Sequence, residues 1–370
     1  MVDIPARMGR CLFMKKKRTH QRSAALEIAN VINSGLGKPV LRLASDPELK
    51  IVRIPTPSLT INRITGGGFS LGRHVELFGD PSVGKSVIAM GTMALSQQRG
   101  NICALIDPEG VFDPEWFTHL GGYPEELVYQ RPDDAEDVIG SLRMLSEMAI
   151  KGAPLEVVTI DSISAMVTKE QVEKDPREEE RVASQARMMS RALRVLTTRN
   201  KKVLFIWTNQ LRSNIGFGSQ FQPNVTTGGR ALGFYATTRI EFKKTGQVTK
   251  PKQRAVKGKL EKKEVKTGDW IQVRAEKEKS TRPYQQGAYI FDSDKGELDL
   301  ASEIIQLGLE DGFIERVGNK YEYESIDGEI IREFEKAFKA RIMDDLEIQG
   351  EMVDAITDTT HQMSRMDSEE

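Results

Sequence analysis

Residues 79–86 read GDPSVGKS, which has the spacing G-x-x-x-x-G-K-[ST]. In this motif, backbone amides of a glycine-rich loop surround a phosphate chain, a lysine adds positive charge, and a hydroxyl meets Mg²⁺. The helix that follows adds the positive end of its dipole. The sequence therefore predicts that a nucleoside triphosphate and Mg²⁺ are held by Gly79, Asp80, Pro81, Ser82, Val83, Gly84, Lys85 and Ser86.

Four short apolar runs end in polar groups that could act on this triphosphate. Near-continuous Val, Ile, Leu, Phe and Trp is typical of strands buried on both faces of a parallel sheet. Ligands bind beyond the carboxyl ends of such strands, so we expect one crevice to collect the polar groups. The runs are HVELFGD (74–80), ICALIDPE (102–109), VVTIDS (157–162) and VLFIWTNQ (203–210), and predicted helices at 86–100 and 136–152 provide crossovers.

Three side chains at these strand ends have the chemistry that triphosphate hydrolysis needs. Asp161 can hold Mg²⁺, or it can serve as a helix N-cap. Glu109 can orient the attacking water and accept its proton, or it is a solvated loop residue. Gln210 can sense the γ-phosphate through a hydrogen bond, or it is a plain strand-end amide.

Two polar segments, 167–185 and 212–230, are long for loops in a compact domain, which favours a functional role. The second follows the proposed phosphate-sensing glutamine directly. Between them, Arg187, Arg191 and Arg194 fall at i, i+4 and i+7, on one face of a predicted helix. This stripe indicates either a solvated face or a track for a nucleic-acid backbone.

The core of the chain is predicted to run from residue 51 to residue 290. Residues 1–50 hold one predicted helix (21–37) and a short strand (39–44), too little for a domain. We expect this arm to pack on its own core or on a neighbouring subunit. The remaining predicted parts are a small α+β domain over 291–346 and a polar, acidic, disordered tail over 347–370.

Composition narrows the class of protein further. With 370 residues and 39% hydrophobic side chains the chain can bury a core, and a net charge of −1 leaves polyanion binding open. Its two cysteines, Cys11 and Cys103, show no disulfide framework or metal-ligand spacing, which predicts a reduced, cytoplasmic setting. No run of about 18 apolar residues occurs, so no membrane partner is expected.

Several of these segments, in order, resemble the RecA family of homologous-recombination ATPases over roughly residues 25–345. The segments are GDPSVGKS, IDPEGVFDPEW, VVTIDSISAMVTK, ARMMSRALRVL, TNQLRSNIGFG, TTGGRALGFYAT and VRAEKEKSTRPY. The resemblance implies an α/β fold with a RecA-type P-loop ATPase core, a mostly parallel twisted sheet, an N-terminal arm and a small C-terminal domain. It implies ATP and Mg²⁺ as cofactors, single- and double-stranded DNA as partners, helical self-assembly, and strand exchange in recombination and repair.

The resemblance also implies roles at the nucleotide. Glu109 matches the catalytic glutamate, Lys85 the phosphate-loop lysine and Gln210 the γ-phosphate switch. Asp113 and Trp116 match the residues that hold adenine, with the aromatic ring stacked on the base.

Further roles implied by the resemblance lie between subunits and on DNA. Lys277 and Lys279 match a pair that reaches the γ-phosphate of the neighbouring subunit, so ATP would sit between two copies of the chain. Phe234 matches an interface residue that relays the nucleotide state. The implied DNA-binding residues are Val182, Arg187, Arg194, Arg212, Ile215, Gly228, Gly229 and Arg230.

Some features depart from the family or stay open. Residues 174–183 and 212–230 match the two DNA-binding loops of the family. The first of these carries three consecutive glutamates, 178–180, which would repel phosphates, and Gly233 stands where the family often has Lys. The basic segment 250–266 fits either a solvated hairpin or an auxiliary DNA contact, and the acidic tail either competes with DNA or aids solubility. Rival functions are a ring-forming helicase or loader and a regulatory module with an inactive ATPase. The N-terminal arm (1–50) and the pair Lys277 and Lys279 favour the recombinase over the helicase or loader.

Overall fold

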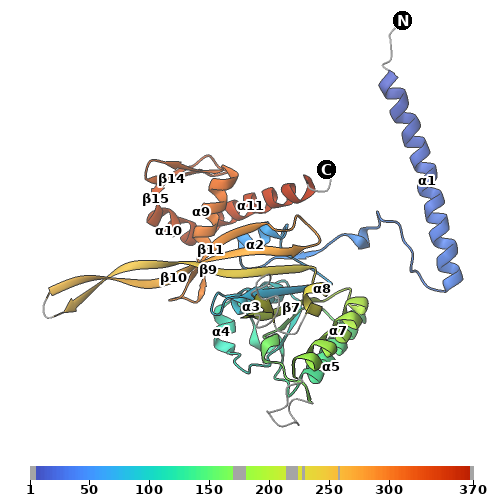
Figure 1. Cartoon of the computed structure of the whole chain (residues 1–370). Coiled ribbons are helices and arrows are strands. Elements are labelled where there is room, and N and C mark those ends of the chain that lie inside the picture. The colour runs from blue at the N-terminus through green and yellow to red at the C-terminus, as the bar shows by residue number, and fades with distance from the viewer. Residues whose placement is uncertain (1–5, 170–180, 214–223, 227–229, 257–258, 367–370) are drawn as a thin grey trace, which may run out of the picture. The chain divides into compact units, whose positions relative to one another are not determined.

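The structure is a computed structural model that describes residues 6–169, 181–213, 224–226, 230–256 and 259–366 (Figure 1). The chain divides into two compact units, Met1–Val52 and Arg53–Glu370. None of the helices in these described ranges has both the length and the apolarity needed to cross a bilayer.

The first unit consists mainly of the helix α1 (Ala6–Leu36), followed by the short 3-10 helix η1 (Pro47–Leu49). The predicted helix over 21–37 is confirmed, since it forms the second half of α1. Apolar side chains without cover in this chain are expected to mark a contact surface. Those exposed on this helix are Leu26, Ile28, Val31, Ile32 and Leu36.

The strand predicted at 39–44 is wrong, because these residues form no ladder. The side chain of Asn33 replaces a partner strand there. Its Oδ1 accepts hydrogen bonds from the amides of Val40 (2.9 Å) and Leu41 (2.8 Å), and its Nδ2 donates to the Leu41 carbonyl (2.7 Å). A nearby side chain therefore satisfies the hydrogen-bonding groups of this extended backbone in place of a second strand. Asn side chains often compete with secondary structure in this way.

The second unit is built on a ten-stranded sheet in the order β12-β11-β10-β9-β3-β7-β6-β4-β5, with β8 paired to β7. The strands from β9 to β5 run parallel, whereas β10, β11 and β12 are antiparallel. The four predicted apolar strands are confirmed as β3, β4, β6 and β7. The bounds are β3 (His74–Gly79), β4 (Ile102–Ile106), β5 (Leu127–Gln130), β6 (Leu155–Ile160), β7 (Leu204–Ser213), β8 (Asn224–Thr226), β9 (Thr238–Val256), β10 (Lys259–Glu278), β11 (Gln286–Asp292) and β12 (Glu297–Leu298).

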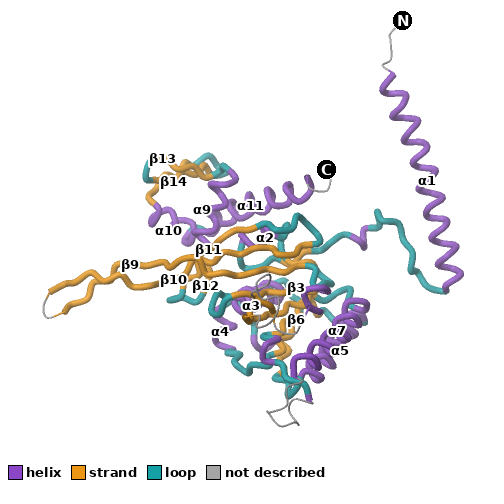
Figure 2. The backbone as a smooth tube through the Cα atoms, viewed as in Figure 1, coloured by secondary structure: helices purple, strands orange, loops and turns teal. Residues whose placement is uncertain are grey.

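Helices cover both faces of this sheet, as the continuous apolar strands require (Figure 2). Alternate residues of one strand enter different cores: Leu105 packs with the α3 side chains, whereas Ala104 and Ile106 pack with α5 and α7. The predicted crossover helices are confirmed as α3 and α5. The helices and short strands of this part are β1 (Arg53–Ile54), α2 (Leu59–Ile64), β2 (Phe69–Ser70), α3 (Lys85–Gln97), α4 (Pro114–His119), α5 (Ala135–Ile150), α7 (Arg181–Arg199) and α8 (Arg230–Tyr235).

Strands β9 and β10 continue past the sheet as a long two-stranded ribbon that projects from the body of the second unit (Figure 1). The basic segment 250–266 lies on this ribbon. At its base, the buried Asp269 carboxylate binds the ammonium groups of Lys244 (3.0 Å) and Lys266 (2.8 Å). This pairing lowers the pKa of Asp269, although burial alone would raise it.

A third core holds the C-terminal elements together, with side chains from α9, α10, α11 and a three-stranded sheet. A helix followed by a small sheet and a further helix matches the predicted α+β pattern. The bounds are α9 (Leu300–Asp311), β13 (Ile314–Val317), β14 (Lys320–Glu324), β15 (Ile330–Phe334), α10 (Glu335–Asp344) and α11 (Leu346–Met366).

The disordered tail predicted over 347–370 is wrong for its described part, which forms the helix α11. Ile348, Met352 and Ile356 follow one another at i, i+4 and i+8 and are buried in the third core. The buried Arg63 guanidinium of α2 binds Asp311 and donates to the Thr360 hydroxyl at 2.8 Å. The segment is acidic on average, but its apolar residues form a stripe on one face of α11, and this stripe packs the helix onto the third core.

A buried histidine gives the core a predictable acid sensitivity. His74 stacks on Phe205 at 5.1 Å between ring centres, and its Nδ1 accepts a hydrogen bond from Trp207 Nε1 at 3.2 Å. Its Nε2 has no partner within the described residues. Burial, and to a lesser extent the charge of Arg73, lowers the pKa of His74 to about 3.

Acidification should therefore destabilise the fold through His74. The unfolded chain takes up a proton near pH 6.5 and the folded chain only near pH 3, so stability falls as the pH decreases between these values. Between pH 6.5 and pH 5 the contribution is about 2 kcal/mol. Urea unfolding at several pH values should show a shallower acid loss for His74→Phe than for the unmodified protein; equal pH slopes would contradict the assignment.

Candidate functional site

Glycines at two positions shape the predicted phosphate loop between β3 and α3. Gly79 has a φ of +141°, and a Cβ there would lie 2.0 Å from the Phe242 carbonyl oxygen. Gly84 has a φ of +86° and precedes the first residue of α3, Lys85. The eight predicted residues 79–86 therefore form a turn at a helix N-terminus, where free amides and the helix dipole favour anions.

Neighbouring strands hold this loop in place. The Asp80 carboxylate accepts a hydrogen bond from the Lys244 amide of β9 at 3.1 Å, and the Asp80 amide donates to the Phe242 carbonyl at 3.1 Å. From β11, the Tyr289 hydroxyl donates to the Val83 carbonyl at 3.4 Å. The loop is thus fixed on its sheet side by contacts that use only one of its own amides, that of Asp80.

Lys85 is folded back onto its own loop. Its Nζ donates to the carbonyls of Gly79 (3.3 Å) and Asp80 (2.5 Å). Burial lowers the pKa of Lys85, and the carboxylates of Asp161, Asp80 and Glu109 oppose this effect. Lys85 thus lies at the phosphate loop with three carboxylates near enough to affect its pKa; its contact with a triphosphate stays a prediction.

Asp161 lies directly after β6 and is mostly buried. Its carboxylate accepts a hydrogen bond from the Thr208 hydroxyl at 2.5 Å and also bonds the Ser86 side chain. Burial raises the pKa of Asp161; the bonds to Ser86 and Thr208 counteract this, and the charges of Glu109 and Asp107 reinforce it. A hydroxyl and a carboxylate in contact beside a phosphate loop are oxygen donors of the kind that Mg²⁺ prefers.

Glu109 lies in the loop that follows β4. The Asp107 carboxylate holds this loop by accepting hydrogen bonds from the amides of Gly110 (2.8 Å) and Phe112 (2.9 Å). The Ser162 hydroxyl donates to Glu109 Oε1. Sequence reasoning missed both Asp107 and Ser162; the tendency of Asp side chains to bond nearby backbone amides is a signal that could have revealed the first.

Gln210 lies on β7 directly opposite Gly79 of the phosphate loop, and its side chain is exposed. Its amide donates to the Asn209 side-chain oxygen at 2.9 Å. An exposed amide side chain next to the loop is suited to bind a phosphate oxygen. The polar groups predicted to meet beyond the strand ends thus gather on one edge of the sheet.

Asp113 and Trp116 lie at the start of α4. The Asp113 carboxylate caps this helix by accepting from the amides of Glu115 (2.9 Å) and Trp116 (3.4 Å). The indole stacks on His119 at 5.0 Å and lies against Gly296, where a Cβ would meet the ring at 2.0 Å. Their contact with adenine stays a prediction.

Lys277 lies away from the phosphate loop of its own chain. It pairs with Arg239 of β9, which pairs with Glu76 of β3, three residues and about 10 Å before Gly79. Its Nζ donates to the carbonyls of Gly233 and Phe234 in α8, both at 2.8 Å.

Lys277 has a shifted pKa and lies beside an exposed aromatic residue, Phe234. Burial, together with the charges of Lys279 and Arg239, lowers the pKa of Lys277 to about 8, while Glu76 acts in the opposite direction. Lys279 is exposed, and the Phe234 side chain is 71% exposed. A large exposed aromatic next to cationic groups is typical of a contact surface.

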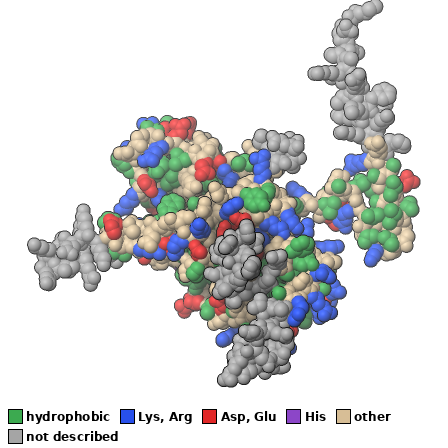
Figure 3. Space-filling view, in the orientation of Figure 1, with side chains coloured by type: hydrophobic (Ala, Val, Ile, Leu, Met, Phe, Trp, Pro, Cys, Tyr) green, Lys and Arg blue, Asp and Glu red, His purple; other side chains and the backbone are tan. Residues whose placement is uncertain are grey.

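The candidate DNA-binding residues are only partly described. Arg187 and Arg194 lie on the exposed side of α7, and Lys and Arg side chains gather over this region (Figure 3). Arg194 Nε donates to the Tyr235 hydroxyl of α8 at 3.4 Å. Ile215, Gly228 and Gly229 lie outside the described residues, as do the side chains of Val182, Arg212 and Arg230.

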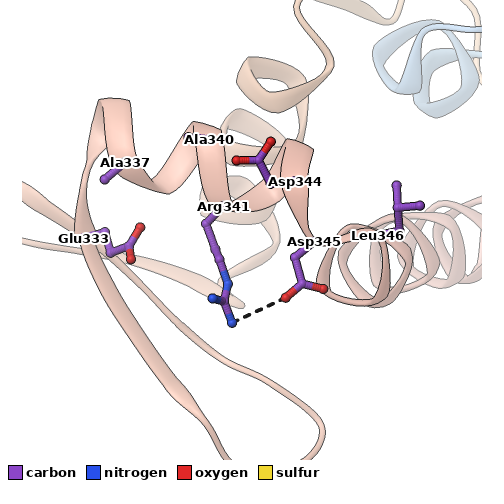
Figure 4. Close-up of a pocket in the computed structure, with 7 residues that line it drawn as sticks. All are labelled: Glu333, Ala337, Ala340, Arg341, Asp344, Asp345 and Leu346. Carbon is purple, nitrogen blue, oxygen red and sulfur yellow. Dashed lines mark ion pairs between the residues drawn. The ribbon is translucent and has the colours of Figure 1, made fainter.

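A separate cavity of about 650 Å³ lies in the C-terminal domain and includes none of the predicted site residues (Figure 4). Residues from β15, α10 and the start of α11 line it. Arg341, on its wall, is paired with Asp345 at 3.3 Å and Glu329 at 3.4 Å. Arg341 is thus already paired with carboxylates, and the other charged residues of the lining, Glu333, Asp344 and Asp345, are acidic, which does not favour an anionic nucleotide.

Comparison with known proteins gives a consistent result. The family model described as the RecA N-terminal domain matches residues 24–290. Protein RecA of Paracoccus denitrificans is 34% identical over 325 residues, 85% of this chain and 85% of that protein. Protein RecA of Nocardia farcinica is 32% identical over 314 residues, 83% and 84% of the two chains. For Protein RecA of Pseudomonas fluorescens strain Pf0-1 the identity is 33% over 290 residues, 77% and 76%.

Proposed function

Because the chain belongs to the RecA family, we propose that it is a DNA-dependent ATPase of homologous recombination and DNA repair. It forms ATP-bound filaments on single-stranded DNA and catalyses homologous pairing and strand exchange. The observation that carries this proposal is a chain of contacts at the carboxyl ends of the strands: Asp161 bonds Ser86 next to Lys85, and Ser162 next to Asp161 bonds Glu109. The chain is related over most of its length to Protein RecA.

Nucleotide binding uses the turn at the N-terminus of α3. The free backbone amides within residues 79–86 bind the phosphates, and Lys85 exchanges its loop carbonyls for the β- and γ-phosphates. Ser86 and Asp161 would hold Mg²⁺, which neutralises phosphate charge. Asp113 and Trp116 hold the adenine.

Hydrolysis depends on a base next to the phosphate loop. Glu109 orients a water molecule and accepts its proton, and the hydrogen bond from Ser162 fixes one carboxylate oxygen. Gln210 binds the γ-phosphate. The proposed second DNA-binding loop, 212–230, begins two residues later at the end of β7, so the position of this loop changes with the nucleotide state.

The catalytic pocket is completed by a second copy of the chain. Lys277 and Lys279 reach the γ-phosphate bound to the neighbouring subunit, and Phe234 lies in the same interface. The distance of Lys277 from its own phosphate loop and the exposure of Phe234 support this arrangement. Residues 1–50 form an arm whose exposed apolar helix docks on the next subunit.

DNA lies along the loops that border α7 and α8. Arg187, Arg194, Arg212 and Arg230, with the Gly228–Gly229 pair, contact phosphates, and Val182 and Ile215 wedge between bases. Binding should therefore weaken steeply with salt and depend little on sequence.

The test is ATP turnover with and without single-stranded DNA, combined with analysis of strand-exchange products. The proposal predicts DNA-stimulated turnover, joint DNA products that require ATP, and filaments by electron microscopy. Closed rings without filaments would instead favour a helicase or loader, and turnover that stays undetectable with DNA would favour an inactive ATPase.

Replacing Lys277 and Lys279 together by alanine should lower DNA-stimulated turnover by about 100-fold, as when a positioned charge is removed from a transition state. Nucleotide binding by the isolated subunit should change little, because both lysines act on a neighbour. Fluorescent nucleotide titration and phosphate release measure the two effects. A collapse of nucleotide affinity in the isolated subunit would contradict the shared pocket.

A further inference from the structure

Glu76 is a fully buried carboxylate in the middle of the central strand β3, with 0% of the residue exposed. Its neighbours in sequence, Val75 and Leu77, belong to the apolar core. A charged side chain at such a position is costly unless it is paired and hydrogen-bonded. The proposed hydrolysis mechanism gives this residue no role.

Both carboxylate oxygens of Glu76 are engaged, each by a different neighbouring strand. Oε1 accepts a hydrogen bond from Asn209 Nδ2 of β7 at 2.9 Å. Oε2 accepts a charge-assisted bond from Arg239 Nε of β9 at 2.5 Å. Since β7 and β9 flank β3 on its two sides, one side chain joins three strands.

Each partner of Glu76 leads to a group of the proposed ATP site. On one side, Asn209 accepts the amide hydrogen of Gln210, so its position affects the proposed γ-phosphate sensor. On the other, Arg239 pairs directly with Lys277 across β9 and β10.

Two cations opposite each other on adjacent strands repel, and Glu76 supplies the compensating charge. The Arg239 guanidinium is also held over the Phe78 ring at 4.5 Å. Arg239 is therefore held beside Lys277, the lysine that is proposed to reach the ATP site of the neighbouring subunit.

We propose that Glu76 is a positioning residue that joins the strand carrying the γ-phosphate sensor to the strand carrying Lys277. This inference rests on the proposed function. In a filament, a change at Gln210 in one ATP site passes through Asn209, Glu76 and Arg239 to the lysine that completes the adjacent site. The carboxylate touches no nucleotide itself.

A purely structural ion pair would behave differently. Losing one partner of a buried pair destabilises a fold and weakens all activities together. A positioning role predicts a split instead: nucleotide affinity of the isolated subunit is kept, while the DNA-stimulated kcat, which needs two subunits, is reduced. The split separates the two possibilities even if stability decreases as well.

The experiment is a double-mutant cycle with Glu76→Gln, Arg239→Gln and both changes together in the full chain. Each single change should lower DNA-stimulated kcat about tenfold, the effect of losing a hydrogen bond to a charged group. Nucleotide affinity of the isolated subunit should stay within about twofold. In the double variant two amides can bridge the strands without unpaired charge, so kcat should recover most of the loss.

Lys201→Gln, which removes an exposed charge just before β7, is the matched control and should keep the unmodified kcat. Single variants with normal DNA-stimulated kcat, or losses that simply add in the double variant, would overturn the inference. If Glu76→Gln does not fold, the partly exposed Arg239→Gln carries the same kcat test. Absence of DNA stimulation in the unmodified protein would refute the proposed function itself, which is a separate outcome.

Discussion

Alanine in place of Lys85 is expected to abolish ATP-dependent DNA binding. The Lys85 ammonium is partly buried and donates to the loop carbonyls of Gly79 and Asp80, so it can move to the β- and γ-phosphates by exchanging neutral acceptors for charged ones. Removing a positioned charge of this kind costs about 100-fold or more. Fluorescent ATP titration and DNA anisotropy with and without ATP measure the loss.

Lys151→Ala provides a control for the removal of a lysine, because Lys151 is exposed after the last residue of α5. It should bind DNA like the unmodified protein. Thermal unfolding without nucleotide should be similar for both variants. Normal ATP-dependent filaments from Lys85→Ala would show that the phosphate loop is not the site that controls assembly.

Glu109→Gln is expected to separate assembly from hydrolysis. The amide oxygen can still accept the hydrogen bond from Ser162, so the loop should keep its conformation. It cannot accept a proton from water, and loss of a general base costs about 100- to 10,000-fold in turnover. Filaments should therefore form with ATP and persist, whereas those of the unmodified protein dissociate as ATP is consumed.

Phosphate release and the lifetime of filaments by electron microscopy measure this separation. Glu115→Gln is a matched control, since Glu115 is an exposed carboxylate in the first turn of α4. It should hydrolyse ATP normally. Unchanged turnover in Glu109→Gln would remove this residue from the mechanism and leave Glu109 with the solvated-loop interpretation.

The strands and crossover helices of the core could be predicted because their signal is local. Runs such as VLFIW (203–207) are apolar at every position, and VVTI (157–160) is apolar apart from one threonine, which favours strands covered on both faces. The position of Asp161 at the end of such a run then follows from the chain direction, and the structure indeed places it beside Ser86.

The two wrong predictions came from contacts that composition does not reveal. The segment 39–44 has strand-like residues, but Asn33 satisfies its backbone and no ladder forms. The C-terminal residues are polar on average, yet Ile348, Met352 and Ile356 share one buried face of α11. In each case a few specific contacts determined the structure, although the average composition of the segment favoured a different one.

The contacts that site residues make with neighbouring strands and helices could not be predicted from the sequence. Lys277 was identified only through the family resemblance. Nothing in the local sequence, Lys277–Glu278–Lys279, indicates that Lys277 bonds to the carbonyls of α8. Glu76 looked like one more residue of an apolar strand. Its link to Asn209 and Arg239 depends on which strands are neighbours, and that order appears only in the folded sheet.

A complementation assay tests the shared pocket most directly. Glu109→Gln lacks the base but can lend its lysines, whereas the double variant of Lys277 and Lys279 to alanine has the base but no lysines to lend. In mixed filaments one of the four possible subunit orders unites an intact base with intact lysines, so about a quarter of the normal DNA-stimulated turnover should return. A mixture no more active than the average of its two components would contradict a site built from two copies of the chain.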